Sequence, residues 1–286
     1  MSVPNEKKIA IITSASDAAG ASIKAQLLRN YGFEKASGED FDGFDVYSLP
    51  IEDCEARLFT IAGESTRYER IDERIAAGLF VFATRHFSKA GIPALTTHSV
   101  GNWGRAELGG KDQTICHTSP SLLKLFLQNL AAVAKSEDYT GEVVQESTHH
   151  GPYLEKPAVF IEVGSTEQQW KDAHLASMVA DSLIGGLGDY SVLGEHGEKH
   201  EPVVALGGPH YASNLRKLML DSQYAIGHIC PKHHLQSLTP ELLRQAMDSC
   251  FPQKAAAVAL DWKGLGTEKK RIMQILESNC IEYFRV

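Results

Sequence analysis

Short apolar runs alternate with longer amphipathic stretches along almost the whole chain. The runs at residues 7–13 and 158–164 are nearly continuous apolar sequences between turn residues, which is typical of strands buried on both faces. The stretch at 118–136 repeats its apolar positions at helical spacing, with Ser119 available as a cap and Pro120 at its first position. Further strands are expected at 56–62, 78–84, 93–97, 142–148, 202–208, 224–230, 255–262 and 281–286, and further helices at 19–32, 165–186, 211–220, 239–250 and 267–279.

Strands that alternate with helices in this way indicate an α/β fold. We expect a mixed, largely parallel central sheet with helices on both faces, formed as a single domain over residues 1–286. A two-lobed arrangement with a seam near residues 137–141 is the alternative. In sheets of this type, ligands bind in the crevice outside the carboxyl ends of the strands.

Histidines gather at those predicted strand ends. His98 follows the run at 93–97, and the pair His149 and His150 follows the run at 142–148. Imidazole is a common zinc ligand, and it moves protons near neutral pH. The strand ends therefore predict a site for metal binding or proton transfer. The other histidines at such ends are His86, His210 and His228.

The adjacent pair His149 and His150 can serve one site only under a geometric condition. Neighbouring residues on a strand point to opposite faces, so the strand has to end before both side chains can face one crevice. The Gly151-Pro152 that follows favours such an end. Because the chain has no HExxH motif, a zinc site would be assembled from separate loops. From the residues alone, metal ligands, a general base and structural histidines all stay open.

Two further stretches have to be weighed as sites. The turn LGGPHYASN at 206–214 leads from a strand into a helix N-terminus, where backbone N–H groups can bind an anion, although Pro209 removes one donor. His196 and His200 have the spacing of one helix face, but their segment lacks apolar periodicity. We interpret that segment as a solvated loop and not as a metal site.

Composition limits the class and location of the protein. The apolar fraction is 43%, yet no apolar run approaches the ~20 residues needed to span a bilayer. The N-terminus lacks the long apolar region of a signal peptide, so we expect a cytoplasmic protein without membrane contact. Five widely spaced cysteines without a CxxC pair argue against a disulfide framework or a cysteine zinc cage.

The charge distribution leaves room for a polyanionic partner. The net charge is −8, but residues 31–75 alone hold 12 acidic and 5 basic side chains. The rest of the chain is close to neutral and can carry basic patches. One candidate patch contains Arg85, Lys89 and Lys111, and the other contains Lys263.

Several sequence blocks together resemble a known family. In chain order they are TRHFSKAGIPALTTHSVGNWGRAELGGKD, ESTHHGP, FIEVGSTEQQW, GGPHYAS, IGHICPK and DWKG. Their order and spacing resemble the archaeal- and plant-type D-aminoacyl-tRNA deacylases, from about Ile9 to the C-terminus. The chain departs from the family pattern at the glycine-rich turn, where Pro209 and Ser213 replace a glycine and a proline.

The resemblance implies a function. Members of this family hydrolyse the ester that joins a D-amino acid to the terminal ribose of tRNA, with zinc as cofactor. Their fold is related to peptidyl-tRNA hydrolases and nucleoside phosphorylases. We therefore expect the 3′ acceptor end of D-aminoacyl-tRNA as the partner, and we favour a monomer. Two alternatives are a peptidyl-tRNA or other zinc-dependent ester or amide hydrolase of the same fold, and a non-catalytic tRNA- or nucleotide-binding module.

With the resemblance, the strand-end residues become a specific site hypothesis. A subset of its histidines would bind zinc, and a remaining imidazole or carboxylate would act as general base on the attacking water. Asn102 would stabilise the charge that develops on the ester carbonyl. The catalytic candidates are His98, Asn102, Glu146, His149, His150 and Glu162; the zinc candidates are His98, His149, His150 and His210; the candidates for tRNA phosphates are Arg85, Lys89, Lys111 and Lys263.

Overall fold

The structure is a computed structural model, and it describes residues 4–193 and 199–286. Of the two histidines that we assigned to a solvated loop, His196 lies outside the described residues, and His200 lies in irregular chain before the next strand. Across the described ranges, no helix is both long enough and apolar enough to cross a bilayer.

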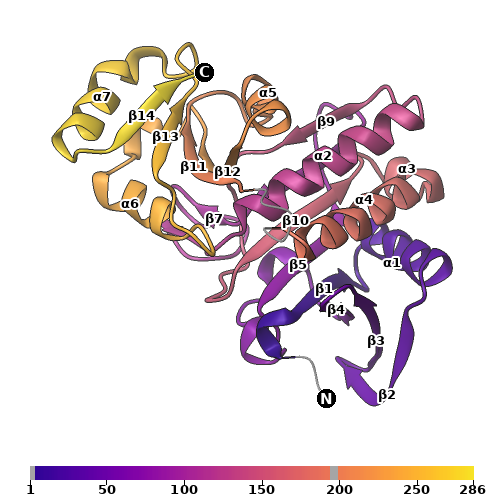
Figure 1. Ribbon diagram of the computed structural model, residues 1–286. Coiled ribbons are helices and arrows are strands. Elements are labelled where there is room, and N and C mark those ends of the chain that lie inside the picture. Colours follow the sequence, from indigo (N-terminus) through magenta and orange to yellow (C-terminus); the bar gives the residue numbers. More distant parts are fainter. Residues whose placement is uncertain (1–3, 194–198) are drawn as a thin grey trace.

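Helices and strands alternate as the sequence predicts (Figure 1). The strands are β1 (Lys8–Ser14), β2 (Glu34–Phe41), β3 (Phe44–Ile51), β4 (Cys54–Ile61), β5 (Leu79–Arg85), β6 (Ala94–Ser99), β7 (Gly101–Asn102), β8 (Thr114–Ile115), β9 (Glu142–Gln145), β10 (Ala158–Val163), β11 (Glu201–Leu206), β12 (Tyr224–Cys230), β13 (Ala257–Leu260) and β14 (Glu282–Arg285). The helices are α1 (Ala18–Asn30), α2 (Pro120–Ser136), α3 (Glu167–Trp170), α4 (Ala173–Ser191), α5 (Ser213–Asp221), α6 (Pro240–Asp248) and α7 (Lys269–Ser278).

The larger sheet is mixed, with the strand order β2-β3-β4-β1-β5-β10-β6-β9. The central strands β4, β1, β5 and β10 run parallel, β6 is antiparallel to β10, and β2 and β3 form an antiparallel hairpin at one edge. Side chains alternate between the two faces of these strands. Ile9 and Ile11 pack in the core shared with α1, α2 and α4, whereas Ala10 and Ile12 pack beneath the loops that cover the other face.

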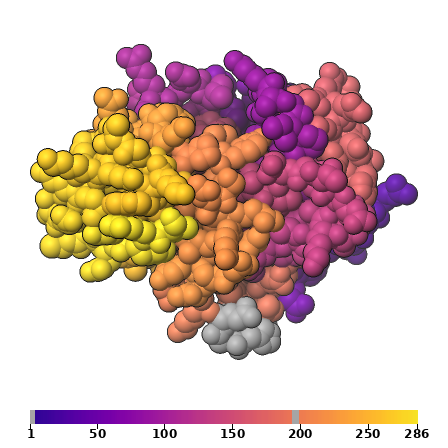
Figure 2. Space-filling view, turned by 90° about the horizontal axis from the view of Figure 1, so that it is seen from above, coloured from indigo at the N-terminus to yellow at the C-terminus, as the bar shows by residue number. Residues whose placement is uncertain are grey.

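The smaller sheet is parallel throughout, with the order β12-β11-β13-β14. Helices lie on both of its faces: α2 and α5 share one apolar core with it, and α6 and α7 share the other. The α/β class is therefore confirmed, although the helices cover one face of the larger sheet and the strands form two main sheets instead of one, with β7 and β8 as a separate antiparallel pair. Figure 2 shows the C-terminal residues gathered on one side of the molecule.

The helix α2 joins the two sheets into one packed structure. It contacts β6 and β9 of the larger sheet and β12 of the smaller one. A single apolar core accordingly contains Leu95 and Ile161 from one sheet together with Val203 and Ile226 from the other. The chain passes from the first sheet to the second between β10 and β11. The division of the chain into domains stays a prediction.

Several elements differ from the expectations, among them the short strands β7 and β8, which were not expected. The helix expected at 165–186 is split, because Asp172 accepts hydrogen bonds from the backbone N–H groups of His174 and Leu175 and so starts a new helix. The hairpin of β2 and β3 was not expected. Most side chains of β2 are exposed, and an exposed edge strand has no apolar alternation to reveal it.

The contact between α2 and α4 depends on a glycine. A Cβ atom at Gly186 would lie 2.5 Å from Cδ1 of the buried Phe126, whereas a Cβ atom at Gly188 in the same helix would meet nothing within 4 Å. We expect Gly186→Ala to lower the free energy of unfolding by about 1–3 kcal/mol through overpacking. As the matched control, Gly188→Ala should raise it by up to ~1 kcal/mol through helix propensity. Thermal unfolding of both variants is the measurement, and equal melting temperatures would contradict this account of the packing.

Candidate active site

A cavity of about 560 Å³ lies where the carboxyl ends of several strands meet. Strands β1, β5 and β10 supply part of its lining, and segments that follow β9 and β11 supply the histidines His149, His150 and His210 and the carboxylate Glu146. Loops after β1, β4, β5 and β7 and the helix α3 complete the lining. This is the position at which α/β sheets bind ligands. The lining residues are Ser14, Ser16, Asp17, Glu64, Ser65, Thr66, Thr84, Arg85, His86, Phe87, Leu108, Glu146, His149, His150, Glu162, Trp170 and His210.

The segment 146–151 is hydrogen-bonded to both sheets. The backbone N–H of Glu146 donates to the carbonyl of Thr97 on β6, at 3.0 Å, in the larger sheet. Two residues later, the N–H of Thr148 donates to the carbonyl of Ile229 on β12, at 3.0 Å, in the smaller sheet. The histidines of this segment are therefore fixed at the junction between the sheets.

Both histidines of the adjacent pair line the cavity. His149 still forms a parallel bridge with Val100, but His150 has a φ of 44°, in the left-handed region. This change of backbone conformation ends the extended chain and turns the second side chain toward the first, with 4.3 Å between the ring centroids. The arrangement agrees with the interpretation of the pair as residues at the end of a strand.

Three imidazoles share a hydrogen-bonding pattern that suits metal ligands. His98, His149 and His150 each donate Nδ1–H to a backbone carbonyl, which leaves Nε2 with its lone pair. Each offers a ring nitrogen, and these nitrogens lie within 4.8 Å of one another. The acceptors are the carbonyls of Ser99, Ser147 and Gly151, at 3.1, 2.7 and 2.6 Å respectively.

The Nε2 atom of His98 is a buried polar atom that lacks a hydrogen bond among the described residues. The carboxylate oxygen Oε1 of Glu162 lies 3.7 Å from this nitrogen, which is too far for a hydrogen bond. A buried nitrogen without a partner is costly, and a bound cation would satisfy it. This atom is the observation that best supports a metal at the three histidines.

A second cluster surrounds His86. Its Nδ1 lies 3.0 Å from Glu146 and 3.5 Å from Glu162, and its Nε2 lies 2.5 Å from the hydroxyl of Tyr211. Burial alone would lower the pKa of His86, but the two carboxylates outweigh burial and raise it to about 11. Thr84 further fixes Glu162 by donating its hydroxyl at 2.7 Å. His86 is therefore an imidazolium held between two buried carboxylates.

Both carboxylates are ionised despite complete burial. Burial raises the pKa of Glu146, but hydrogen bonds from His210 and His86 hold it well below its usual range. The pKa of Glu162 is also lowered, because His86 and His98 oppose the effect of burial. His210 connects this cluster to the cavity: its Nε2 lies 2.7 Å from Glu146, and its side chain is 43% exposed.

The adjacent histidines of the cavity are neutral near pH 7. Burial and the neighbouring His98 lower the pKa of His150 to about 4, and the same two causes hold the pKa of His149 well below its usual range. For His98, burial acts in the same direction, but Glu162 outweighs it and raises the pKa. Neutral imidazole is the form that binds zinc, so His149 and His150 are ready to act as ligands.

Other residues of the site hypothesis lie elsewhere. The amide of Asn102 donates to the carbonyls of Gly109 and Lys111, at 3.0 and 3.3 Å, and so holds the loop beside the cavity. It does not line the cavity, which gives no support to its role as an oxyanion donor. At the glycine-rich turn, Gly207 donates its N–H to Cys230, so the anion-binding interpretation loses this donor.

The basic candidates are spread over the surface. Arg85 lines the cavity, with its guanidinium 5.4 Å from the centroid of the Trp170 ring. Lys89 and Lys263 are exposed, and Lys111 places its Nζ 3.3 Å from the ring centroid of Tyr153.

The sequence did not predict that His86 lies at the centre of the charged cluster, between Glu146 and Glu162. It also did not predict the contacts that Thr84, Ser147 and Tyr211 make with this site. A histidine directly after a buried strand was the signal for His86.

We expect His86→Ala to lower the free energy of unfolding of the metal-free protein by about 3–5 kcal/mol, because Glu146 and Glu162 lose their imidazolium. Adding Glu162→Gln should restore part of this loss, since one buried charge is then removed. Denaturant unfolding of the two variants in a chelator measures the effect. His174→Ala serves as control, because its ion pair with Glu137 is exposed and contributes at most ~1 kcal/mol. If His86→Ala lowers the free energy of unfolding no more than His174→Ala does, His86 does not stabilise the two buried carboxylates.

Comparison with known proteins places this chain in a family. Residues 74–284 match the family of D-aminoacyl-tRNA deacylases. The D-aminoacyl-tRNA deacylase of Pyrococcus abyssi is 34% identical over 93% of this chain and 95% of its own length. The corresponding enzyme of Thermococcus kodakarensis is also 34% identical, over 96% of this chain and 98% of its own length.

A solved structure supports the fold. A crystal structure described as a conserved protein of unknown function is 29% identical, with a TM-score of 0.82, over 99% of this chain and 96% of that one. This similarity extends over both sheets. Taken with the sequence matches over nearly the full length, it leads to one conclusion. The chain belongs to the D-aminoacyl-tRNA deacylase family.

Proposed function

We propose that this protein hydrolyses the ester bond between a D-amino acid and the 3′-terminal ribose of tRNA, releasing the free amino acid and tRNA. The observation that carries the proposal is the cluster of His98, His149 and His150, with each Nδ1 bound to a carbonyl and with Glu146 beside it. Relatives over nearly the whole chain are D-aminoacyl-tRNA deacylases.

Zinc is the cofactor that this cluster fits best. Imidazoles whose second nitrogen is held by a carbonyl are typical zinc ligands, and a cation would satisfy the unpartnered Nε2 of His98. We propose that His98, His149 and His150 hold the ion. Such an ion supplies Lewis acidity, which polarises an ester carbonyl and makes water more acidic.

The surrounding residues hold and move protons. Glu146 is an ionised carboxylate whose Oε2 lies 3.9 Å from Nε2 of His149, so it can accept a proton from the attacking water. The same oxygen lies 2.7 Å from Nε2 of His210, which faces the cavity and can pass a proton on toward the leaving ribose oxygen. His86 and Glu162 keep Glu146 in its position, and His86 balances part of the buried negative charge.

A comparison of substrates tests the proposed function. D-Tyr-tRNA, L-Tyr-tRNA and a peptidyl-tRNA are offered to the protein, each with and without a chelator. We expect release of D-tyrosine at a rate well above that of L-tyrosine or peptide, and loss of this release in the chelator. Preferred hydrolysis of peptidyl-tRNA would overturn the proposal in favour of a related hydrolase. Binding without hydrolysis, even after zinc is added, would favour a tRNA-binding module.

We expect His98→Ala and His149→Ala each to lower kcat/KM for D-Tyr-tRNA at least ~100-fold, the lower range for the loss of an acid–base group. Both variants should also bind less zinc, which atomic absorption measures. The control is His174→Ala, an exposed histidine on α4 that should keep activity and zinc unchanged. Near-normal turnover in both site variants would show that the cluster is not the active site.

The exposed lysines Lys89 and Lys263 are our candidates for contacts with tRNA phosphates. We expect Lys89→Ala and Lys263→Ala to weaken tRNA binding, and each to reduce the slope of log Kd against log salt concentration by about 1, because one phosphate contact is lost. The control is Lys35→Ala, since Lys35 lies on the edge strand β2 and pairs with Asp45 at 2.8 Å. An unchanged slope would remove that lysine from the interface.

A further inference from the structure

The rim of the cavity is unusually apolar. Phe87 is 64% exposed and Leu108 is 55% exposed, and these are the two most exposed large hydrophobic side chains in the described part of the chain. Both line the cavity, together with His149 and His150 of the histidine cluster. Burying one large apolar side chain contributes about 1.5–3 kcal/mol, so exposed apolar residues at one cavity point to a ligand.

Trp170 supports Phe87 from within the same wall. Its ring centroid lies 6.4 Å from that of Phe87, with an angle of 48° between the planes. The indole Nε1–H donates to the carbonyl of His86 at 2.8 Å, so the ring has a fixed orientation next to the residue that pairs with the buried carboxylates. The aromatic pair is thus attached directly to the candidate active site.

The turn before α3 allows the side chain of Trp170 to pack against the backbone of Gly164. Gly164 has a φ of 80°, and a Cβ atom there would lie 2.7 Å from Cβ of Gln169 and 3.1 Å from Cδ1 of Trp170. Gln169 and Thr166 then form a capping box that starts the short helix. Only a glycine permits this close approach, so the backbone fixes the position of the indole as well as its orientation.

A positive charge lies beside the aromatic pair. The guanidinium of Arg85 stands 5.4 Å from the Trp170 centroid, and the Arg85 side chain is exposed. Aromatic rings that are next to an arginine, at the entrance of a polar cavity, are the usual surface for an unpaired nucleotide: the ring stacks on the base, and the arginine attracts the phosphate.

We propose that Phe87, supported by Trp170, stacks on the terminal adenine of tRNA while the ester enters the histidine cluster. The inference rests on the proposed function. In that function the ester is carried by the ribose of the terminal adenosine, so the adenine base belongs to the same nucleotide as the reacting ester. The chain thereby recognises the tRNA end by ring stacking at the cavity rim, independently of the amino acid.

Uncharged tRNA with 2-aminopurine in place of its terminal adenine tests the proposal, because 2-aminopurine fluorescence is quenched by stacking. We expect quenching when wild-type protein binds. Phe87→Ala should lose most of the quenching and raise Kd about 5- to 100-fold, the range for one base–aromatic stack. Phe87→Tyr keeps the ring and should restore both readings.

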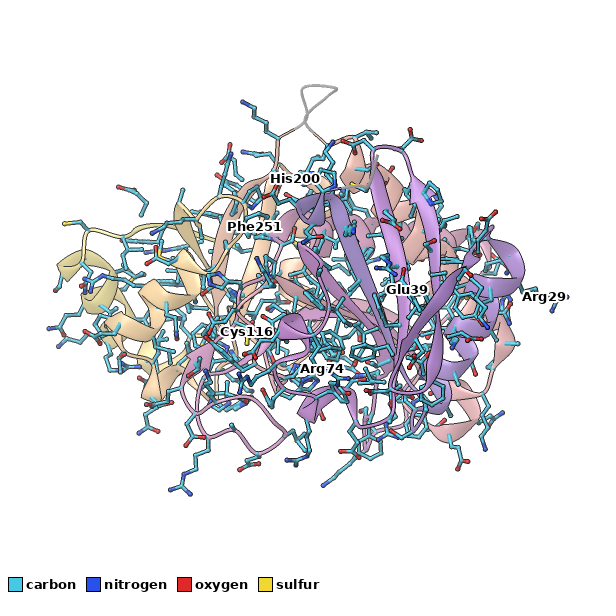
Figure 3. All side chains as sticks on the ribbon, turned by 90° about the horizontal axis from the view of Figure 1, so that it is seen from below. Arg29, Glu39, Arg74, Cys116, His200 and Phe251 are labelled. Atoms are coloured by element: carbon cyan, nitrogen blue, oxygen red, sulfur yellow. The ribbon has the colours of Figure 1, made fainter. Side chains whose placement is uncertain are left out.

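The matched control is Phe251→Ala. Phe251 is 47% exposed but lies outside the cavity lining, in the loop after α6 (Figure 3), so its removal should change neither reading. Equal quenching by wild type and Phe87→Ala would overturn the proposal. So would a Phe87 effect that appears only with charged tRNA and varies with the amino acid, which would assign the ring to the side chain.

The outcomes also separate this proposal from the proposed function. If the wild type hydrolyses D-Tyr-tRNA but quenching does not depend on Phe87, only the stacking surface is wrong. If quenching depends on Phe87 and no ester is hydrolysed, the stacking surface stands and the deacylase assignment fails.

Discussion

The hydrogen bonding of the segment 146–151 holds the whole site together. Its backbone is bound on both sides: Glu146 donates to Thr97 on β6 of the larger sheet, and Thr148 donates to Ile229 on β12 of the smaller sheet. In addition, the N–H of Ser147 donates to the carbonyl of His210, and the carbonyl of His150 accepts from Gly101 on β7. An extended segment shared in this way has no freedom to shift relative to either sheet. The histidines and the carboxylate that it carries are therefore placed with the accuracy of a core strand, although they lie at a cavity surface.

The buried charges follow from this rigidity. Glu146 and Glu162 are ionised in the interior, which is stable only where positive groups are fixed beside them. His86 supplies one positive charge against two negative ones, so one negative charge remains, and it would attract a cation to the neighbouring histidines. The same cluster thus explains why carboxylates are tolerated inside the protein and why a metal would bind next to them.

Much of this arrangement could be predicted from the sequence, for identifiable reasons. The apolar runs predicted the buried strands, and His98 and His149 lie close together because β6 and β9 are parallel neighbours. His98 lies within β6 and not beyond its end, and β6 is antiparallel to β10, so the approach of this pair to Glu162 does not follow from a shared strand edge. The hairpin β2–β3 escaped prediction because exposed edge strands carry no apolar pattern.

The partners of His86 escaped prediction for a different reason. Glu146 and Glu162 meet His86 only through the register of β5, β9 and β10 in three dimensions. Nothing in the local sequence distinguishes a histidine between two carboxylates from one that simply ends a strand. Asn102 shows the converse: its position beside a motif suggested chemistry, whereas its amide holds a loop.

The residues that line the cavity come from two parts of the chain. The histidines and carboxylates lie within the 74–284 region that matches the family, whereas Ser14, Asp17 and Ser65 belong to the preceding strands and loops. Figure 1 shows these first strands, β1 to β4, in the lower part of the view near the N-terminus, where they form one side of the larger sheet. A change at Ser14, Asp17 or Ser65 can therefore alter the shape of the cavity while the histidines and carboxylates keep their positions.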